Sequence, residues 1–193
     1  MIRSLHGLVL AGGQSRRMGR DKAALQVNGR TALERTVAML APHCETVFVS
    51  VRAGDDDDLR ARYPQINDRH GGVGPADGIA SALAHAPEAA WLVVACDLPR
   101  LSSAALQALI AGRDPRADAT AFRSGRDELP EPLCAIYEPR SRALIEEHLA
   151  RDKRCPRKML LTMNTRLLPP ADDDALANAN TPDDWISIVG HRA

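Results

Sequence analysis

Aromatic residues are scarce in this chain of 193 residues. Phe, Trp and Tyr make up only 3% of it, and the two tryptophans lie far apart, which argues against a surface that stacks the bases of a single strand. The formal net charge is zero, so no global positive field would attract nucleic acid or anionic lipid. We therefore expect neither nucleic acid nor a membrane as a partner.

The cysteines form no recognisable pairing pattern. There are four of them, they are widely spaced, and Cys-x-x-Cys does not occur: Cys44, Cys96, Cys134 and Cys155. No apolar run is long enough to cross a bilayer, and no signal peptide pattern is present. The simplest interpretation is a cytoplasmic enzyme with reduced thiols, in one domain over residues 1–193. Nothing in the residues forces a dimer, so a monomer or weak oligomer is expected.

Two common phosphate-binding motifs are also absent. A Walker loop needs Gly-x-x-x-x-Gly-Lys-Ser/Thr, but Gly19 is followed by Arg20, Asp21 and Lys22. The dinucleotide fingerprint Gly-x-Gly-x-x-Gly does not occur either, which argues against a hydride-transfer enzyme.

A different glycine-rich segment follows the first apolar run. Residues 7–10 are too short for a helix and read as a buried strand, which leads directly into Gly12-Gly13. Four cations follow within seven residues: Arg16, Arg17, Arg20 and Lys22. A strand, a turn with free backbone N–H groups and a cluster of positive charge suit a polyphosphate. The alternative is an ordinary glycine turn with solvated arginines, and the density of cations favours phosphate binding.

Strand and helix patterns alternate along the rest of the chain. The predicted strands cover residues 47–51, 65–68, 91–96, 119–122 and 132–137, and the predicted helices cover 31–41, 77–86, 103–111, 141–150 and 156–163. This alternation, without repeats or a low-complexity linker, predicts the α/β class, with a single doubly wound, mostly parallel sheet flanked by helices.

The strongest strand signal, Trp91–Cys96, ends at Asp97-Leu98-Pro99. Ligands of open α/β sheets sit outside the carboxyl ends of the strands, so Asp97 is placed to face the same crevice as Gly12-Gly13. The competing interpretation is a cap or turn aspartate, but a serine at 102 or 103 can cap the next helix instead.

The glycine segment also resembles a family signature. The pattern Leu10-Ala11-Gly12-Gly13-x-Ser15-x-Arg17-Met18-Gly19-x-Asp21-Lys22 is similar to the loop of the molybdenum cofactor guanylyltransferases, within the Rossmann-like nucleotide-diphospho-sugar transferase type. The double glycine favours guanine over the related cytidylate-transferring group. The resemblance implies that the backbone of Leu10, Ala11, Gly12 and Gly13 binds the nucleotide together with Lys22.

The resemblance extends over nearly the whole chain and implies further site residues. Asp97 matches the aspartate that binds the magnesium bridging the nucleotide phosphates, and Asp68 matches a nucleotide-binding aspartate. The tail Asn178-x-Asn180-Thr181-Pro182 also matches, and its asparagines are expected to border the acceptor or the metal. Arg16, Arg17, Lys22 and Asp97 are the expected catalytic set.

Three departures from the family pattern stand out. Ser50 stands where the family has an asparagine after the second strand, and it is expected to bind the nucleotide although it can make fewer hydrogen bonds. Asp77 replaces a small residue and is expected to bring a charge beside the base and acceptor pocket. The segment 155–158 has no match, and either binds an anionic acceptor or simply begins a helix.

The implied reaction is Mg²⁺-dependent transfer of GMP from GTP to the terminal phosphate of molybdopterin, with release of pyrophosphate. Molybdenum cofactor assembly proteins are the implied partners. Two alternatives stay open, namely a related nucleotidyltransferase that uses CTP or another acceptor phosphate, and a catalytically silent nucleotide-binding module.

Overall fold

The computed structural model describes residues 4–11, 21–27, 29–52, 57–71, 74–169, 175–177 and 179. Seven strands form one sheet in the order β5-β4-β1-β6-β8-β7-β9. In chain order they are β1 (Leu5–Leu10), β4 (Val47–Val51), β5 (Gln65–Asn67), β6 (Ala90–Ala95), β7 (Ala119–Arg123), β8 (Pro130–Tyr137) and β9 (Thr165–Leu168). A separate antiparallel pair consists of β2 (Gln26–Val27) and β3 (Arg30–Thr31).

The pairing makes the sheet mostly parallel. β1 pairs in parallel with β4 on one side and β6 on the other, β4 with β5, and β7 with β9. β8 runs antiparallel to both of its neighbours. From β1 the chain builds outward to β4 and β5 and then returns to the other side of β1 with β6. The switch point of the topology therefore lies between β1 and β6.

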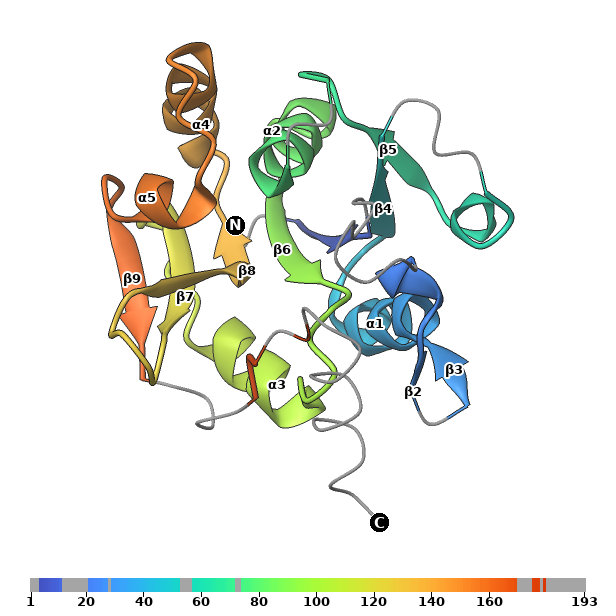
Figure 1. Cartoon of the computed structure of the whole chain (residues 1–193). Helices are drawn as coiled ribbons and strands as arrows, with labels where there is room; N and C mark the ends of the chain where they lie inside the picture. Colours follow the sequence, from blue (N-terminus) through green and yellow to red (C-terminus); the bar gives the residue numbers. More distant parts are fainter. Residues whose placement is uncertain are drawn as a thin grey trace.

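Helices cover both faces of this sheet (Figure 1). They are α1 (Ala32–Leu40), α2 (Pro75–His85), α3 (Ser103–Ala111), α4 (Ser141–Ala150) and α5 (Pro156–Leu160). One core cluster packs α1 and α3 against the sheet through residues such as Leu33, Leu106 and Val94. The other packs α2, α4 and α5 through residues such as Ile79 and Trp91. The two-sided burial explains why β6 is apolar and buried throughout.

Local chemistry sets where the helices begin. Thr31 caps α1 in a capping box: its hydroxyl accepts from the Glu34 backbone N–H at 3.1 Å, and the Glu34 carboxylate accepts from the Thr31 N–H at 3.0 Å. Ser102 caps α3 through the Ala105 N–H. Asp97 is therefore not needed as the cap of the next helix, although it does lie in a turn.

The fold class predicted from the sequence is confirmed, and most elements lie within one or two residues of their predicted bounds. The helix predicted over 156–163 is shorter, ending at Leu160. The strands β2, β3 and β9 were not predicted, since β2 and β3 have two residues each and β9 has four, too few for a clear period.

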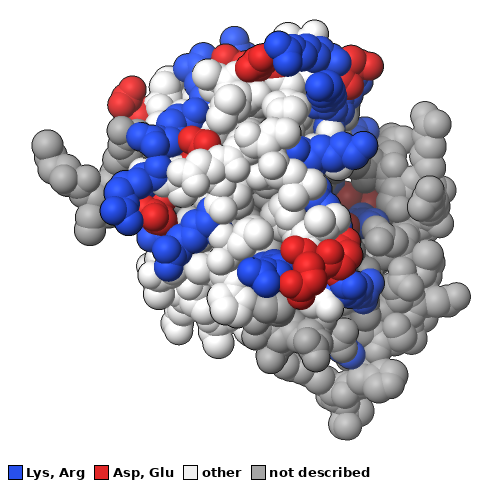
Figure 2. All heavy atoms as spheres, turned by 90° about the vertical axis from the view of Figure 1, so that its left-hand side faces the viewer, with Lys and Arg blue, Asp and Glu red and all other residues white. Residues whose placement is uncertain are grey.

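The surface formed around α4, α5 and β9 carries charges of both signs. Figure 2 shows Lys and Arg next to Asp and Glu around a central uncharged area. Two i,i+4 pairs on and beside α4 contribute to this mixing, Arg142–Glu146 at 2.9 Å and Arg151–Glu147 at 2.6 Å. Exposed pairs of this kind contribute little to stability, so this face is a solvated surface with locally balanced charge.

No helix within the described ranges is long and apolar enough to cross a membrane.

Candidate active site

The candidate site lies at the carboxyl ends of β1 and β6, at the switch point of the sheet. Leu10 pairs with Ala95, and the Cys96 N–H donates to the Leu10 carbonyl at 3.3 Å. The residues that follow these strands, Ala11 and Asp97, therefore emerge side by side. This is the place where open α/β sheets bind their ligands.

Lys22 and Asp97 meet at this point. The Lys22 Nζ lies 2.9 Å from the Asp97 Oδ2, although the residues are 75 positions apart in the sequence. Their side chains are only 16% and 18% exposed, so the pair is largely withdrawn from solvent. Lys22, the last cation of the basic segment that follows β1, thus meets the acidic residue that follows β6.

A small pocket adjoins this pair, with a volume of about 90 Å³. The residues at the carboxyl ends of β1 and β6 line it together with the charged side chains of Lys22 and Asp97. The full lining is Leu10, Ala11, Lys22, Pro75, Ala95, Cys96, Asp97 and Leu133. Of the predicted nucleotide-binding residues, this places Leu10, Ala11, Lys22 and Asp97 around one cavity. Gly12, Gly13, Arg16 and Arg17 lie outside the described residues.

Only one of the two carboxylate oxygens of Asp97 has a hydrogen-bond partner among the described residues. Its Oδ2 faces Lys22, while its Oδ1 is buried and has no hydrogen-bond partner among the described residues. A buried carboxylate oxygen without a partner is costly unless a ligand or ion satisfies it. The described residues contain no cluster of three or more His, Cys, Asp or Glu that would hold a metal by protein ligands alone.

Ser50 and Asp68 form a second polar pair beside the switch point, at the ends of β4 and β5. The Ser50 hydroxyl donates to the Asp68 Oδ1 at 2.8 Å, and the Asp68 N–H donates to the Val51 carbonyl at 2.9 Å. Ser50 is only 3% exposed, whereas Asp68 is half-buried. Ser50 therefore orients Asp68, and Asp68 is the more exposed member of the pair.

Asp77 does not bring its charge into a pocket, so that expectation was wrong. Its side chain is completely buried in the first turn of α2. It accepts the backbone N–H groups of Arg69 at 3.1 Å and His70 at 2.9 Å, and the Ser81 hydroxyl at 3.3 Å. Asp77 thus fixes the segment that follows Asp68 onto the start of α2, where a carboxylate also suits the helix dipole.

Two arginines that hold the site were not singled out from the sequence. Arg60 contacts both Asp21 and the Ala11 carbonyl. Arg35, on α1, donates to the carbonyls of Leu98 and Leu101 in the loop after Asp97. Sequence patterns offer no signal for such residues, because their partners are backbone carbonyls and carboxylates distant in the chain.

The carboxyl-terminal segment also reaches the site. The Ala179 N–H donates to the Asp97 carbonyl at 3.1 Å, and Ala179 is completely buried. Its two neighbours in the predicted tail motif, Asn178 and Asn180, lie outside the described residues. The one described member of the Asn-x-Asn motif therefore sits directly against the backbone of Asp97.

The segment 155–158 begins a helix, which is one of the two roles considered for it from the sequence. Pro156 occupies the first turn of α5, which is helix-start chemistry. Arg157 is not a solvated cation, since it pairs with Asp127 at 2.8 Å and with Glu131 at 3.0 Å. It lines a small cavity of about 60 Å³ with Leu98 and Leu133, close to the Asp97 loop.

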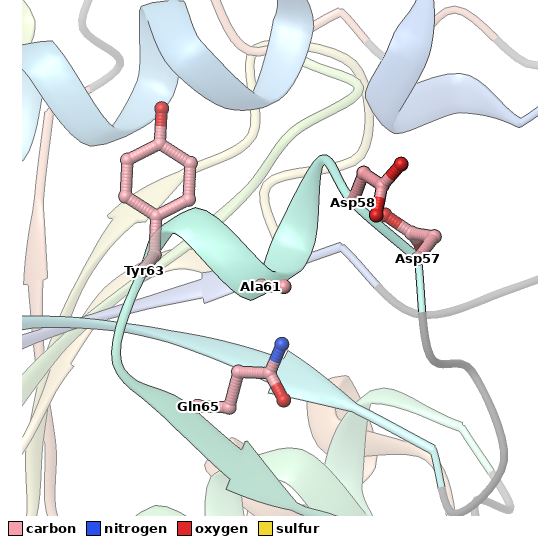
Figure 3. A pocket seen from close by; sticks show the side chains of 5 residues that line it. All are labelled: Asp57, Asp58, Ala61, Tyr63 and Gln65. Atoms are coloured by element: carbon pink, nitrogen blue, oxygen red, sulfur yellow. The ribbon is translucent and has the colours of Figure 1, made fainter.

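A broader hollow of about 550 Å³ lies elsewhere, against β5 and the short turn η3 (Arg60–Arg62). Figure 3 shows Gln65 pointing from β5 toward this turn, with Asp57 and Asp58 together where the turn begins. Tyr63 and Ala61 complete the lining. The described part of its lining holds two carboxylates and no cation, so it would repel a polyphosphate, and the smaller pocket beside Lys22 is the better phosphate site.

Comparisons with known proteins identify the family of this chain. Residues 7–167 match the family model described as the MobA-like NTP transferase domain. The "Molybdenum cofactor biosynthesis bifunctional protein" of Synechocystis sp. is 36% identical over 95% of this chain, and the chain spans 53% of that protein's length. A "Probable molybdenum cofactor guanylyltransferase" of Synechococcus elongatus is also 36% identical, over 94% of this chain and 96% of that protein.

A solved structure supports the same grouping. The "Molybdopterin-guanine dinucleotide biosynthesis protein A" of Archaeoglobus fulgidus superimposes with a TM-score of 0.80 at 27% identity, covering 96% of this chain and 97% of the other. The chain therefore belongs to the MobA-like NTP transferase family and is a nucleotidyltransferase.

Proposed function

We propose that this protein transfers GMP from GTP to the terminal phosphate of molybdopterin and releases pyrophosphate. The observation that carries the proposal is the contact between Lys22 and Asp97 at the switch point, 2.9 Å apart. It brings a cation for phosphate and a carboxylate for a metal to one pocket. The names of the relatives, guanylyltransferases of the molybdenum cofactor, supply the substrate class.

Positioning and charge neutralisation account for the chemistry. An oxygen of the acceptor phosphate forms a bond to the α-phosphorus of GTP, and the bond between that phosphorus and the β-phosphate bridging oxygen breaks. Both reactants are anions, so the main barriers are repulsion and alignment, and no protein nucleophile is required. We propose that Lys22 neutralises phosphate charge with Arg16 and Arg17, while the backbone of Ala11, Gly12 and Gly13 binds phosphate oxygens.

The described part of the site suits Mg²⁺ as the proposed cofactor. Asp97 offers the hard oxygen ligand that Mg²⁺ prefers, and its buried Oδ1 lacks a protein partner. Mg²⁺ needs only one or two carboxylates when substrate phosphates supply further ligands, which fits a site with a single acid. When bound, the ion supplies charge neutralisation on the triphosphate.

Asp68 is the proposed contact to the nucleoside. Its carboxylate is held by the Ser50 hydroxyl and remains half-buried at the carboxyl end of the sheet. Leu10, which lines the pocket, is the proposed backbone contact on the same side. Since Asp77 faces the backbone of residues 69–70, its charge gives no reason to expect a base other than guanine.

The acceptor is proposed to enter beside the tail. The Ala179 N–H donates to the Asp97 carbonyl, which supports the proposal that the amides of its sequence neighbours Asn178 and Asn180 border the acceptor or the metal. We also propose that residues 1–193 act as one nucleotidyltransferase domain in the cytoplasm, as a monomer or weak oligomer. Molybdenum cofactor assembly proteins are the proposed partners.

Pyrophosphate release with each of the four nucleoside triphosphates, with and without molybdopterin, tests the proposal. We expect release with GTP that depends on molybdopterin and on Mg²⁺. A strict preference for CTP would overturn guanylate transfer. Tight binding of GTP without turnover over any acceptor phosphate would instead indicate a silent nucleotide-binding module.

A further inference from the structure

Arg60 is a buried cation whose contacts converge on the phosphate-binding segment. Its side chain is only 6% exposed, although it lies in the short turn η3 between β4 and β5. We propose that Arg60 is a positioning residue that fixes both ends of the glycine segment and thereby places Lys22 for the nucleotide. This inference rests on the proposed function, since it concerns the affinity of that site for a nucleoside triphosphate.

The guanidinium of Arg60 bridges two separate parts of the chain. Its Nη1 lies 2.8 Å from the Asp21 Oδ2 and its Nη2 lies 2.9 Å from the Asp21 Oδ1, a bidentate pair. The Nη2 also donates to the Ala11 carbonyl at 2.6 Å, and the Nη1 contacts the Asp57 carboxylate. Only a planar fork of donors satisfies these acceptors at once, and a lysine ammonium cannot.

These contacts hold the two ends of the segment that carries Gly12-Gly13. Ala11 is the last described residue before that segment and Asp21 the first after it. Bringing the ends of a loop together costs conformational entropy, which Arg60 offsets before the nucleotide arrives. A segment whose two ends are already fixed loses less conformational freedom when it binds a ligand, so the ligand binds more tightly.

Asp21 connects Arg60 to Lys22, because it is held by Arg60 and caps the turn that begins at Lys22. The Asp21 carboxylate accepts the Ala23 N–H at 3.0 Å and so caps the short turn η1 (Lys22–Ala24), whose first residue is Lys22. The Lys22 Nζ in turn contacts Asp97. A continuous series of contacts thus runs from Arg60 through Asp21 and Lys22 to Asp97, while Arg60 itself is absent from the lining of the pocket.

Arg60 also neutralises the negative charge of Asp21 beside the proposed phosphate site. Burial alone would lower the pKa of its guanidinium, but the hydrogen bonds and charges of Asp21 and Asp57 outweigh burial and raise that pKa. Without Arg60, the Asp21 carboxylate would stand uncompensated next to Lys22 in the sequence. It would then repel an incoming triphosphate and compete with it for the lysine.

A double-mutant cycle between Arg60 and Asp21 tests this inference. The variants are Arg60→Met, Asp21→Asn and the double substitution, with Arg60→Lys as the conservative change and Arg62→Met as the control. Arg62 lies in the same turn but is 62% exposed and pairs with Glu34. Calorimetry gives the Kd for GTP in the presence of Mg²⁺, and thermal melting reports the fold.

We expect Arg60→Met, Arg60→Lys and Asp21→Asn each to raise the Kd for GTP about 10-fold or more, and Arg62→Met to leave it within about twofold. The double variant should be no worse than Arg60→Met, because both substitutions break the same link. A purely structural role would lower the melting temperature without changing the Kd of the folded protein.

Wild-type affinity in folded Arg60→Lys or in Asp21→Asn would overturn the inference. Asp21 is exposed, so its variant remains informative even where a change at buried Arg60 prevents folding. Failure of the wild-type protein to bind any nucleoside triphosphate would remove the proposed function itself. Normal wild-type binding with unaffected variants would remove only the role of Arg60.

Discussion

At the scale of single residues, the account depends on the opposite charges of Lys22 and Asp97. We expect Lys22→Ala and Asp97→Ala each to lower guanylate transfer by on the order of 100-fold, as loss of a preorganised charge partner does. Steady-state assays of pyrophosphate release measure the effect, and circular dichroism confirms the fold. The exposed Lys153→Ala is the matched control, and near-normal turnover in either site variant would contradict the assigned roles.

The cysteines offer a second test at the residue scale. Burial raises the pKa of the Cys44, Cys96 and Cys134 thiols from 9.0 to about 12, whereas Cys155 is exposed. A raised pKa means that these three thiols stay protonated and unreactive at pH 8. We expect Ellman's reagent to modify one thiol per chain rapidly at pH 8, and four after unfolding in urea. Rapid modification of Cys96 would mean that the strand end beside Asp97 is open to solvent.

The sequence allowed the position of some site residues to be predicted, but it did not reveal the hydrogen bonds that others make. Lys22, Asp97 and Asp68 follow strands and belong to recognisable motifs, so their placement at the sheet's carboxyl edge was predictable. The hydrogen bond from Ser50 to Asp68, and those from backbone N–H groups to Asp77, were not predicted. Such roles depend on the orientation of a side chain in the fold, which motif spacing does not determine.

At the scale of elements, α2 approaches β1 and β4 so closely that only a glycine fits at position 78. A Cβ on Gly78 would lie 2.6 Å from the Ser50 Oγ and 2.9 Å from the Leu10 Cδ2. Gly→Ala inside a helix normally stabilises by about 0.5–1 kcal/mol, but overpacking costs about 1–3 kcal/mol. We therefore expect Gly78→Ala to lower the free energy of unfolding in a urea titration.

Adding Ser50→Ala to Gly78→Ala provides the control for this prediction. It removes the nearest atom, so the double variant should recover part of the lost stability. A Gly78→Ala protein as stable as the wild type would show that α2 and the sheet are less tightly packed than the structure indicates.

A buried ion pair joins the end of α3 to the end of β8. The Arg113 Nε lies 2.6 Å from the Glu138 Oε1 and the Nη2 lies 3.0 Å from the Oε2, with Glu138 only 1% exposed. Arg113→Met leaves that carboxylate buried without its bidentate partner, so we expect a loss of about 3 kcal/mol in the free energy of unfolding.

The control for this pair is Arg116→Met, whose side chain is 90% exposed and pairs with Asp114. It should leave the free energy of unfolding nearly unchanged, because a solvent-exposed ion pair contributes little. Equal effects of the two substitutions in urea titrations would contradict the distinction drawn between buried and exposed pairs.

At the scale of the whole molecule, the order of the strands creates the site. The alternation of apolar runs and helical periods predicted a doubly wound, mostly parallel sheet, because that pattern depends on two-sided burial along each strand. The antiparallel direction of β8 and the edge position of β9 were not predictable, since strand order and direction depend on long-range pairing. The switch point between β1 and β6 follows from that order, and it is where the acidic side chain of Asp97 and the basic side chain of Lys22 meet.

The most direct test of the central claim is a crystal structure of the protein with Mg²⁺ and a non-hydrolysable GTP analogue. The account predicts a Mg²⁺ ion on the Asp97 carboxylate at about 2.1 Å, with a phosphate oxygen of the same nucleotide in hydrogen-bond contact with the Lys22 Nζ. A triphosphate bound away from this pair, in the hollow lined by Asp57 and Tyr63 or on the other side of the sheet, would contradict it.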